Sequence, residues 1–474
     1  SGVDPNHEDL KDVIWKNAGE IADNGIDDDK NGYIDDVNGW SFLGGKNGDI
    51  ADEATELARI VQKGRKKYND LVSESALTPD ELKEYKEYKK LNEIYTAELA
   101  GQEAQLQGIA GFTEFLDRVK KQNNGVLNKE AFKNYATDNS GEKKAAKRIM
   151  RMIGAGVLKI EELDGQLSEG KKQLVGMINN NKMNADSIRQ FVVGDDINNP
   201  QERFYGNNHV QGPDARHGTH VAGIIAAMRG NTLGIEGIAN NVKIMIVRAV
   251  PNGDERDKDV ANAIRYAVDN GATVINMSFG KYYSPDKKLV DEAVKYAQSK
   301  DVLLIHAAGN DAKDNDVELS YPSRELLSGE TATNWIQVGA SGYKEESTII
   351  GNFSNYGKMK VDLFAPGVDV YATVPNNKYE SLSGTSMASP STAGVAAILR
   401  SYFPEMKSAE IRILLMKTVE PYSGKVEVPG LTKPKGLLKK KTKPVKKKVS
   451  EICISGGFIN VNNAVMELTG TKKK

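Results

Sequence analysis

SLSGTSMASPSTAGVAAIL (residues 381–399) combines a reactive side chain with a clear local structure. Small residues surround Ser386, and the apolar run behind it predicts a helix that continues to about Tyr402. A nucleophilic hydroxyl needs small neighbours so that a carbonyl can approach, and amides at a helix N-terminus can receive a developing negative charge. Ser386 is therefore a candidate nucleophile at the start of a helix.

Short apolar runs around this segment predict a parallel sheet. They read VKIMIVRAV (242–250), ATVINMSFG (272–280), VLLIHAAGN (302–310) and WIQVGASG (335–342). Runs of this length bounded by Gly or Asn are typical of strands buried on both faces. Helical patterns lie between them, and repeated strand–helix–strand units indicate right-handed crossovers. The sequence thus predicts an α/β fold with helices covering both faces of a parallel sheet.

The remaining composition divides the chain into segments. Residues 1–50 and 206–425 share the α/β composition, whereas residues 51–205 are rich in Lys, Glu, Leu and Ala and predict an all-helical insertion. Within it, Thr78, Pro79 and Glu81 form the pattern of an N-terminal capping box. Residues 426–450 are rich in lysine and predict a surface loop, either solvated or in contact with a polyanion. Residues 451–474 return to an ordered segment that ends in a short helix.

Overall composition excludes several classes of protein. The chain has 64 basic and 65 acidic side chains, which argues against a nucleic-acid-binding protein. The single cysteine, Cys453, excludes an internal disulfide, and we interpret it as a small buried hydrophobic residue. No segment approaches the roughly 18 apolar residues that a membrane-spanning helix needs.

Two further motifs place polar side chains where a site could form. HGTHVAG (217–223) puts His217 just ahead of a helix, and LLIHAAGN (303–310) ends a buried strand at Asn310. In a parallel sheet the carboxyl edge of the strands is where sites assemble. The HxxH spacing of His217 and His220 also suggests a metal pair, but no acidic residue lies between them and no third ligand is evident.

Together these motifs resemble those of the subtilisin-like serine peptidases, the subtilase family (peptidase S8). The resemblance covers residues 1–50, 206–425 and GGFINVNNAV (456–465). It implies a parallel, mostly seven-stranded sheet flanked by helices, with the helical insertion lying between the aspartate and histidine segments of the family.

The resemblance also implies a role for each motif. His217 in HGTH is then the general base, Ser386 in GTSMASP the nucleophile and Asn310 in AAGN the oxyanion donor. His220 is structural. In the segment INMSFG (275–280), the implied substrate-binding residues are Ser278, Phe279 and Gly280.

The first residues, SGVDPNHEDL (1–10), begin with the serine of the family's DSG motif. The resemblance therefore implies that the catalytic aspartate stands immediately before Ser1, at the end of a strand that is also outside this sequence. Asp4 aligns with a non-catalytic position. This indicates a fragment of a longer precursor, and the family implies a secreted or cell-envelope location.

IDDDKNGYIDDVNGW (26–40) resembles a calcium-binding loop. The alternating oxygen ligands would be Asp27, Asp29, Asn31, the carbonyl of Tyr33 and Asp35. Asn38 stands where an EF-hand has its bidentate glutamate, so a merely acidic turn is the alternative interpretation. A second and weaker calcium candidate, suggested by the family, pairs Asp9 with Asn231.

Two functions follow from these observations. The first is a serine endopeptidase that hydrolyses protein or peptide substrates through an acyl-enzyme intermediate. The second is a non-catalytic protein that keeps the subtilase fold and uses the helical insertion or the lysine-rich segment for contacts. The three intact motifs favour the enzyme.

Overall fold

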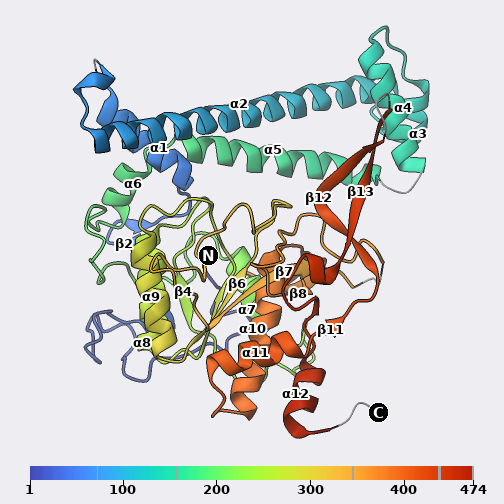
Figure 1. Cartoon of the computed structure of the whole chain (residues 1–474). Coiled ribbons are helices and arrows are strands. Elements are labelled where there is room, and N and C mark those ends of the chain that lie inside the picture. Colours follow the sequence, from blue (N-terminus) through green and yellow to red (C-terminus); the bar gives the residue numbers. More distant parts are fainter. Residues whose placement is uncertain (72, 155–157, 344–345, 436–438, 472–474) are drawn as a thin grey trace. The chain divides into compact units, whose positions relative to one another are not determined.

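The computed structural model describes residues 1–71, 73–154, 158–343, 346–435 and 439–471 (Figure 1). The chain divides into two compact units. We call residues 1–56 and 186–474 the core unit, and residues 57–185 the insertion unit.

A six-stranded sheet forms the centre of the core unit, with the strand order β11-β14-β8-β7-β6-β5. Strands β5 to β8 are parallel to one another, β14 is parallel to β8, and β11 is antiparallel to β14. The strands are β5 (Val274–Met277), β6 (Leu303–Ala307), β7 (Trp335–Ser341), β8 (Leu363–Pro366), β11 (Glu420–Pro421) and β14 (Gly457–Phe458). The α/β class predicted from the apolar runs is confirmed.

Helices cover both faces of this sheet. Leu303 and Ile305 of β6 pack in one apolar cluster with α10 (Thr385–Tyr402), α11 (Ser408–Lys417) and α12 (Val461–Thr469). Leu304, which points to the opposite face, packs in a second cluster with α8 (Asp257–Asp269) and α9 (Lys287–Ser299). Because successive side chains alternate between two buried faces, the strand has no polar face and reads as a continuous apolar run.

A separate parallel pair, β1 (Gly39–Ser41) and β4 (Ile246–Arg248), lies beyond the β5 end of the sheet. The family resemblance implied a mostly seven-stranded sheet, but within the described ranges the sheet stops at β5. A cavity of about 590 Å³ is lined by residues of both β4 and β5. Among the residues that the structure describes, neither β4 nor β5 pairs with another strand on the side that faces the cavity, so the sheet is interrupted there.

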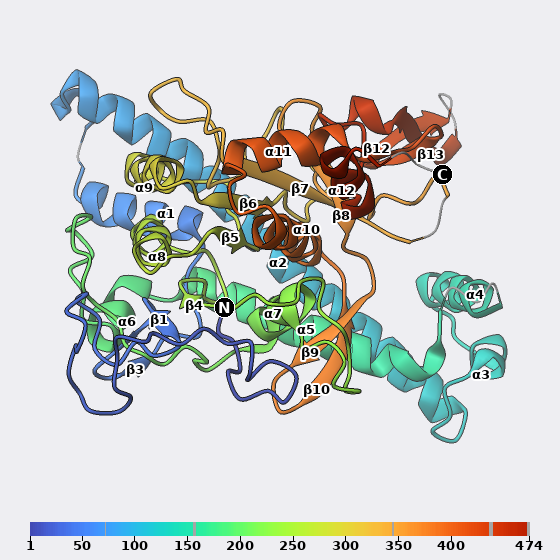
Figure 2. The ribbon, with the colours of Figure 1, turned by 90° about the horizontal axis from the view of Figure 1, so that it is seen from below.

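The other elements of the core unit surround this framework. Helix α7 (Arg216–Ala226) lies beside α10 (Figures 1 and 2). The remaining strands and turns are β2 (Gly44–Gly45), β3 (Gly48–Asp49), β9 (Val370–Val374), β10 (Lys378–Leu382) and the 3₁₀ turn Val449–Glu451. Strands β9 and β10 form an antiparallel pair.

The insertion unit is helical. The elements that make it up or begin and end it are α1 (Glu56–Tyr68), the 3₁₀ turn Glu74–Ala76, α2 (Pro79–Gln122), α3 (Lys129–Asn134), α4 (Ser140–Gly154), α5 (Ile160–Lys182) and α6 (Ala185–Val192). The long helix α2 runs beside α5 (Figure 1). The capping box predicted at its start is confirmed, because the Thr78 hydroxyl accepts from the Glu81 N–H and the Glu81 carboxylate accepts from the Thr78 N–H. None of the described helices has the length and apolarity needed to cross a bilayer.

The lysine-rich segment 426–450 differs from the predicted loop. It contains most of β12 (Lys425–Lys435) and all of β13 (Lys439–Lys448), which pair as an antiparallel hairpin. The reason is an apolar anchor at its base: Val426 and Val428 alternate along β12 and pack with Ile452 and Cys453. Cys453 is buried, as expected, and burial raises the pKa of its thiol to about 11.

Charged side chains at the start of α8 hold both points at which the chain leaves and re-enters the core unit. The Arg256 guanidinium pairs with Glu53 (3.0 Å) and with Asp186 (2.8 Å). About one turn further along α6 and α8, the fully buried Arg189 of α6 pairs with Asp259 of α8 (2.7 Å). A single helix turn therefore fixes both ends of the insertion.

Candidate active site

The first turn of α10 presents Ser386 at the carboxyl edge of the sheet. The helix begins at Thr385. The preceding Gly384 has an extended conformation, which places the start of the helix against the end of the β6 segment. The Ser386 amide is one of the first-turn N–H groups that a helix leaves without an intrahelical acceptor. Its hydroxyl donates to the Ser278 carbonyl at 3.3 Å, and the Ser278 hydroxyl donates to the Ser386 carbonyl at 2.8 Å.

Asn310 is fastened to the same helix turn. Its Oδ1 accepts from the Thr385 N–H at 2.8 Å and from the Thr385 hydroxyl at 3.0 Å. Within the described residues its Nδ2 has no acceptor, so this amide is left to donate to a ligand. The preceding Gly309 has φ +109°, and a Cβ there would lie 2.4 Å from the Asn355 amide. Glycine is required for the chain to bring Asn310 to this position.

The segment Ser278–Gly280 continues from β5 along the site. A polar chain fixes its start, since Asn276 donates to the Ser278 hydroxyl (3.0 Å) and accepts from Ser389 of α10 (2.7 Å). Ser278 and Phe279 are partly buried, whereas Gly280 is exposed. The structure therefore brings together four of the residues predicted from the motifs, namely Ser278, Phe279, Asn310 and Ser386, with Gly280 at the solvent edge.

His217 lies at the start of α7, whose neighbour is α10. Its Nδ1 shares a 3.0 Å hydrogen bond with the Ser1 hydroxyl, and it has no carboxylate partner among the described residues. Burial, reinforced by the nearby N-terminal amine, lowers the pKa of the imidazole to about 4. The imidazole is therefore neutral at pH 7 and able to accept a proton.

The neighbouring polar residues are structural. The His220 Nε2 donates to the Glu380 carbonyl at 3.1 Å, which leaves no HxxH metal pair with His217. Asp4 is buried, and its carboxylate accepts from the N–H groups of Asn6 and Asn376. Asp4 is thus committed to a turn and does not act on His217.

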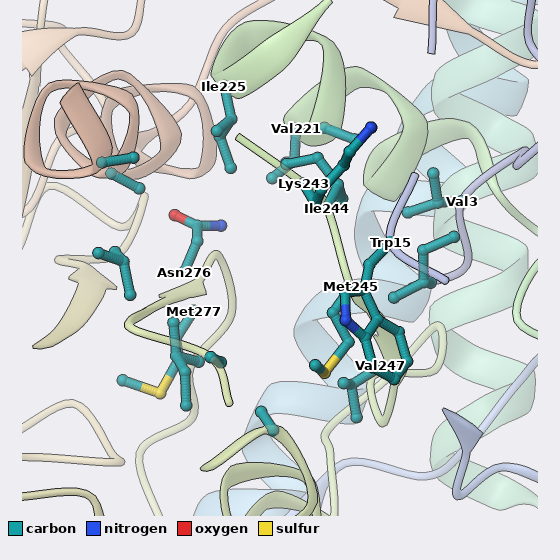
Figure 3. Close-up of a pocket in the computed structure, with 18 of the residues that line it drawn as sticks. Val3, Trp15, Val221, Ile225, Lys243, Ile244, Met245, Val247, Asn276 and Met277 are labelled. Atoms are coloured by element: carbon teal, nitrogen blue, oxygen red, sulfur yellow. The ribbon is translucent and has the colours of Figure 1, made fainter. Parts of the chain in front are cut away.

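The cavity between β4 and β5 opens next to this histidine. Figure 3 shows Asn276 and Met277 on one side and Met245 and Val247 on the other. Its lining is mostly apolar and includes Val221 and other residues of α7, α8 and α10, together with Ser1 and His217. The cavity therefore connects the unpaired edges of two parallel strands with the imidazole.

The acidic loop brings together only part of the predicted calcium ligands. Carboxylate oxygens of Asp27, Asp29 and Glu20 lie within 4.8 Å of one another. Asp35 stands apart from this group, because its carboxylate accepts from the N–H groups of Asn24 and Gly25. Glu20 was missed, since it lies outside the alternating motif and joins the loop through its bonds to the Asp29 and Asp35 amides.

The remaining predicted ligands have protein partners. The Asn31 amide nitrogen donates to the carboxylates of Asp29 (3.2 Å) and Asp36 (3.1 Å), and its amide oxygen accepts from the Tyr33 N–H at 2.8 Å. In the second candidate site, Asn231 donates to the buried Asp9 carboxylate at 2.7 Å. The pair expected there is in contact.

His306 is a further buried polar residue that the motifs did not identify. It lies in β6 between the rings of Phe279 and Trp335, and neither ring nitrogen has a hydrogen-bond partner among the described residues. The only signal in the sequence is a polar residue inside the apolar run VLLIHAAG. Burial lowers the pKa of His306 to about 4.

Comparisons with known proteins relate this chain to one family. The profile described as "Subtilase family" matches residues 1–447. The Thermophilic serine proteinase of Bacillus sp. (strain AK1) is 42% identical over 210 residues, covering 44% of this chain and 48% of that protein. Subtilisin DY of Bacillus licheniformis is 30% identical over 267 residues, covering 56% of this chain and 90% of that protein. The Cell wall-associated protease of Bacillus subtilis (strain 168) is 36% identical over 222 residues, covering 46% of this chain and 23% of that protein.

Replacing His306 should change how stability depends on pH. Between pH 6.5 and 4 the unfolded chain protonates this histidine while the folded chain keeps it neutral, so the free energy of unfolding falls as pH falls. His306→Leu should remove about 2.4 kcal/mol of that loss between pH 7 and pH 4.5. Urea unfolding at pH 7 and pH 4.5 measures it, with the exposed His209→Gln as control; equal pH dependence in the parent and His306→Leu would contradict the assignment.

Proposed function

The chain belongs to the subtilase family, and from this premise we propose that it is a serine endopeptidase that cleaves protein or peptide substrates through an acyl-enzyme intermediate. The observation that carries the proposal is the junction at Thr385, where Asn310 is bonded to the helix turn that presents Ser386. A nucleophile on α10 and an oxyanion donor that follows β6 are thereby held together at one helix turn.

The proposed reaction uses the groups at this edge in sequence. The Ser386 hydroxyl turns from the Ser278 carbonyl towards His217, which takes its proton as Oγ attacks the peptide carbonyl. The Asn310 Nδ2 and the Ser386 N–H donate to the oxyanion, and His217 returns the proton to the leaving amine. Water then repeats the sequence on the acyl-enzyme. Ser278, Phe279 and Gly280 would bind the substrate backbone on the side that precedes the cleaved bond.

The reaction also needs an acid that orients the imidazole, and the cavity suggests its source. We propose an aspartate immediately before Ser1, carried by a strand that fills the cavity between β4 and β5. A strand is favoured over an apolar ligand because the edges of β4 and β5 present backbone N–H and C=O groups, which a strand can pair with and an apolar ligand cannot. Ser1 already contacts Nδ1 of His217, so the preceding residue would stand beside it.

We further propose that the acidic loop binds calcium. The donor set of Glu20, Asp27 and Asp29 consists of hard carboxylate oxygens, which suit this ion. Bound calcium would offset two of the three negative charges of these neighbouring carboxylates and stabilise the loop. Its role is structural, since no residue of the proposed reaction belongs to this cluster.

For location, we propose a secreted or envelope-associated protein. The support is the family resemblance and the name of one relative, the Cell wall-associated protease of Bacillus subtilis. Fractionation of the source cells tests this proposal, and recovery of the protein only from the cytoplasm would contradict it.

Extension of the chain tests the proposed acid. A chain with a Val- and Ile-rich strand ending in Asp directly before Ser1 should melt cooperatively and hydrolyse a fluorogenic protein substrate, because the strand pairs both open edges and the carboxylate stabilises the imidazolium. The same extension ending in Asn should melt alike but lose about 10⁴-fold in turnover. Equal activity of the Asp and Asn extensions would reject the proposed acid.

Substitution at the nucleophile tests the enzymatic function in the Asp-extended chain. Ser386→Ala should abolish hydrolysis and labelling by a fluorophosphonate probe without changing the melting temperature, because the hydroxyl is the attacking group. Asn310→Ala should reduce turnover by about 10² to 10³, the loss seen when one oxyanion donor is removed from a related enzyme. Hydrolysis that persists in Ser386→Ala would contradict the enzyme and leave a binding protein.

Calcium titration tests the loop. Calcium at about 100 times its dissociation constant should add roughly 2.7 kcal/mol to the free energy of unfolding. Glu20→Gln combined with Asp27→Asn should remove this gain, whereas the exposed Asp23→Asn in the same loop should keep it. Thermal melts with calcium and with a chelator measure the difference, and a gain that survives in the double variant rules out this site.

A further inference from the structure

The substrate-binding edge Ser278–Gly280 is followed at once by a buried lysine. The Lys281 side chain is 1% exposed, although an ammonium group is among the groups least often buried. The backbone of Lys281 exchanges two hydrogen bonds with Tyr321, at 3.0 and 2.8 Å. The residue is thus fixed by its main chain on one side and by its side chain on the other.

Three oxygens receive the ammonium group. Its Nζ lies 2.7 Å from the Glu56 carboxylate, 2.7 Å from the Glu255 carbonyl and 2.9 Å from the Asp257 carboxylate. An ammonium has three donors, and these oxygens offer an acceptor for each of them. The tight geometry compensates for the removal of the charge from water and determines where the lysine must lie.

The two carboxylates come from elements with different roles. Glu56 is the first residue of α1, where the chain leaves the core unit. Asp257 begins α8 and also accepts from the Ser284 hydroxyl (2.9 Å) and the Asp286 N–H (2.8 Å), beyond the edge on the C-terminal side. The ammonium therefore connects the start of α1, the first turn of α8 and the segment that continues from the edge.

From this geometry we propose that Lys281 is a positioning residue for substrate, and that the first turn of α1 sets the main-chain position of Ser278–Gly280 through Glu56 and Lys281. The inference rests on the proposed role of this edge in pairing with the substrate backbone. The inference also implies a route of regulation. A partner that displaces the start of α1 would change the affinity for substrate without contacting His217 or Ser386.

The residues that lead into α1 also provide a matched control. Glu53 and Glu56 are three residues apart where the chain enters α1, both are buried, and each carboxylate pairs with a cation. Glu53 pairs with Arg256, for which the described residues show no hydrogen bond or ion pair to the edge, whereas Glu56 pairs with Lys281. Breaking the Glu53–Arg256 pair removes a buried ion pair next to these residues while all three oxygens that receive the Lys281 ammonium stay in the chain.

The test compares two double variants in the Asp-extended chain that carries Ser386→Ala, so that binding is measured without cleavage. One is Glu56→Gln with Lys281→Met, and the other is Glu53→Gln with Arg256→Met. The probe is the fluorescein-labelled hexapeptide Ala-Ala-Ala-Leu-Ala-Ala, and its partner is the same peptide N-methylated at its second and third residues. Fluorescence anisotropy gives each dissociation constant, and thermal melts report stability.

Glu56→Gln with Lys281→Met should weaken binding of the unmethylated peptide by about tenfold, the effect of about one well-placed hydrogen bond. The N-methylated peptide should bind this variant and its parent with nearly equal affinity, because it cannot make the main-chain bonds. Glu53→Gln with Arg256→Met should lower the melting temperature while keeping the parental dissociation constant.

Three outcomes would overturn the inference. Equal weakening in both double variants would show a general loss of stability, and unchanged binding in the Lys281 variant would show that the edge is positioned by other contacts. Failure of the parent to bind the hexapeptide would reject the edge as the substrate site. The serine endopeptidase proposal is judged separately, by fluorophosphonate labelling of Ser386.

Discussion

The packing of α10 across the six-stranded sheet is the constraint on which the site depends. Ala388, Ala393 and Ala396 are buried against β6, β7 and β8, and their small side chains let the helix axis lie close to the strands. Ser386 is the second residue of this helix, so its position follows from the packing. Asn310, at the end of the β6 segment, meets the same turn because β6 lies under the helix. Two groups separated by 76 residues thus share one rigid frame.

Local pattern was sufficient for elements whose stability is decided nearby. The apolar runs identified β5, β6 and β7, and Thr78 with Glu81 identified the start of α2, since each signal lies within a few residues. The hairpin of β12 and β13 was missed because lysines dominate its composition, while its anchor depends on Val426 and Val428 meeting Ile452 across the fold. Glu20 and Lys281 were missed for the same reason: each has partners that only the tertiary structure brings near.

The cavity between β4 and β5 relates the fold to the chemistry. Its walls are mostly apolar, and the edges of β4 and β5 present backbone groups that a further strand could pair with. The imidazole of His217, which also lines the cavity, would be stabilised in its protonated form by a negative charge. One strand ending in a carboxylate would meet both requirements. The same segment would then complete both the sheet and the proposed catalytic triad. Substitutions along the strand should change stability and activity together, whereas a substitution of its last residue should change activity with little effect on stability.

The ion pairs of Arg256 with Glu53 and Asp186 also affect how easily the inserted segment could be exchanged during evolution. When both ends of an excursion are clamped at one helix turn, closing it costs an entropy that grows only with the logarithm of its length, about 0.6 kcal/mol for each doubling. The clamp, made by Arg256 with Glu53 and Asp186, lies in the core unit, and its contacts do not depend on the sequence between its two ends. A guest domain of another size or sequence could therefore occupy residues 57–185 with little thermodynamic effect on the host, which makes this point of the fold a natural place for evolutionary exchange.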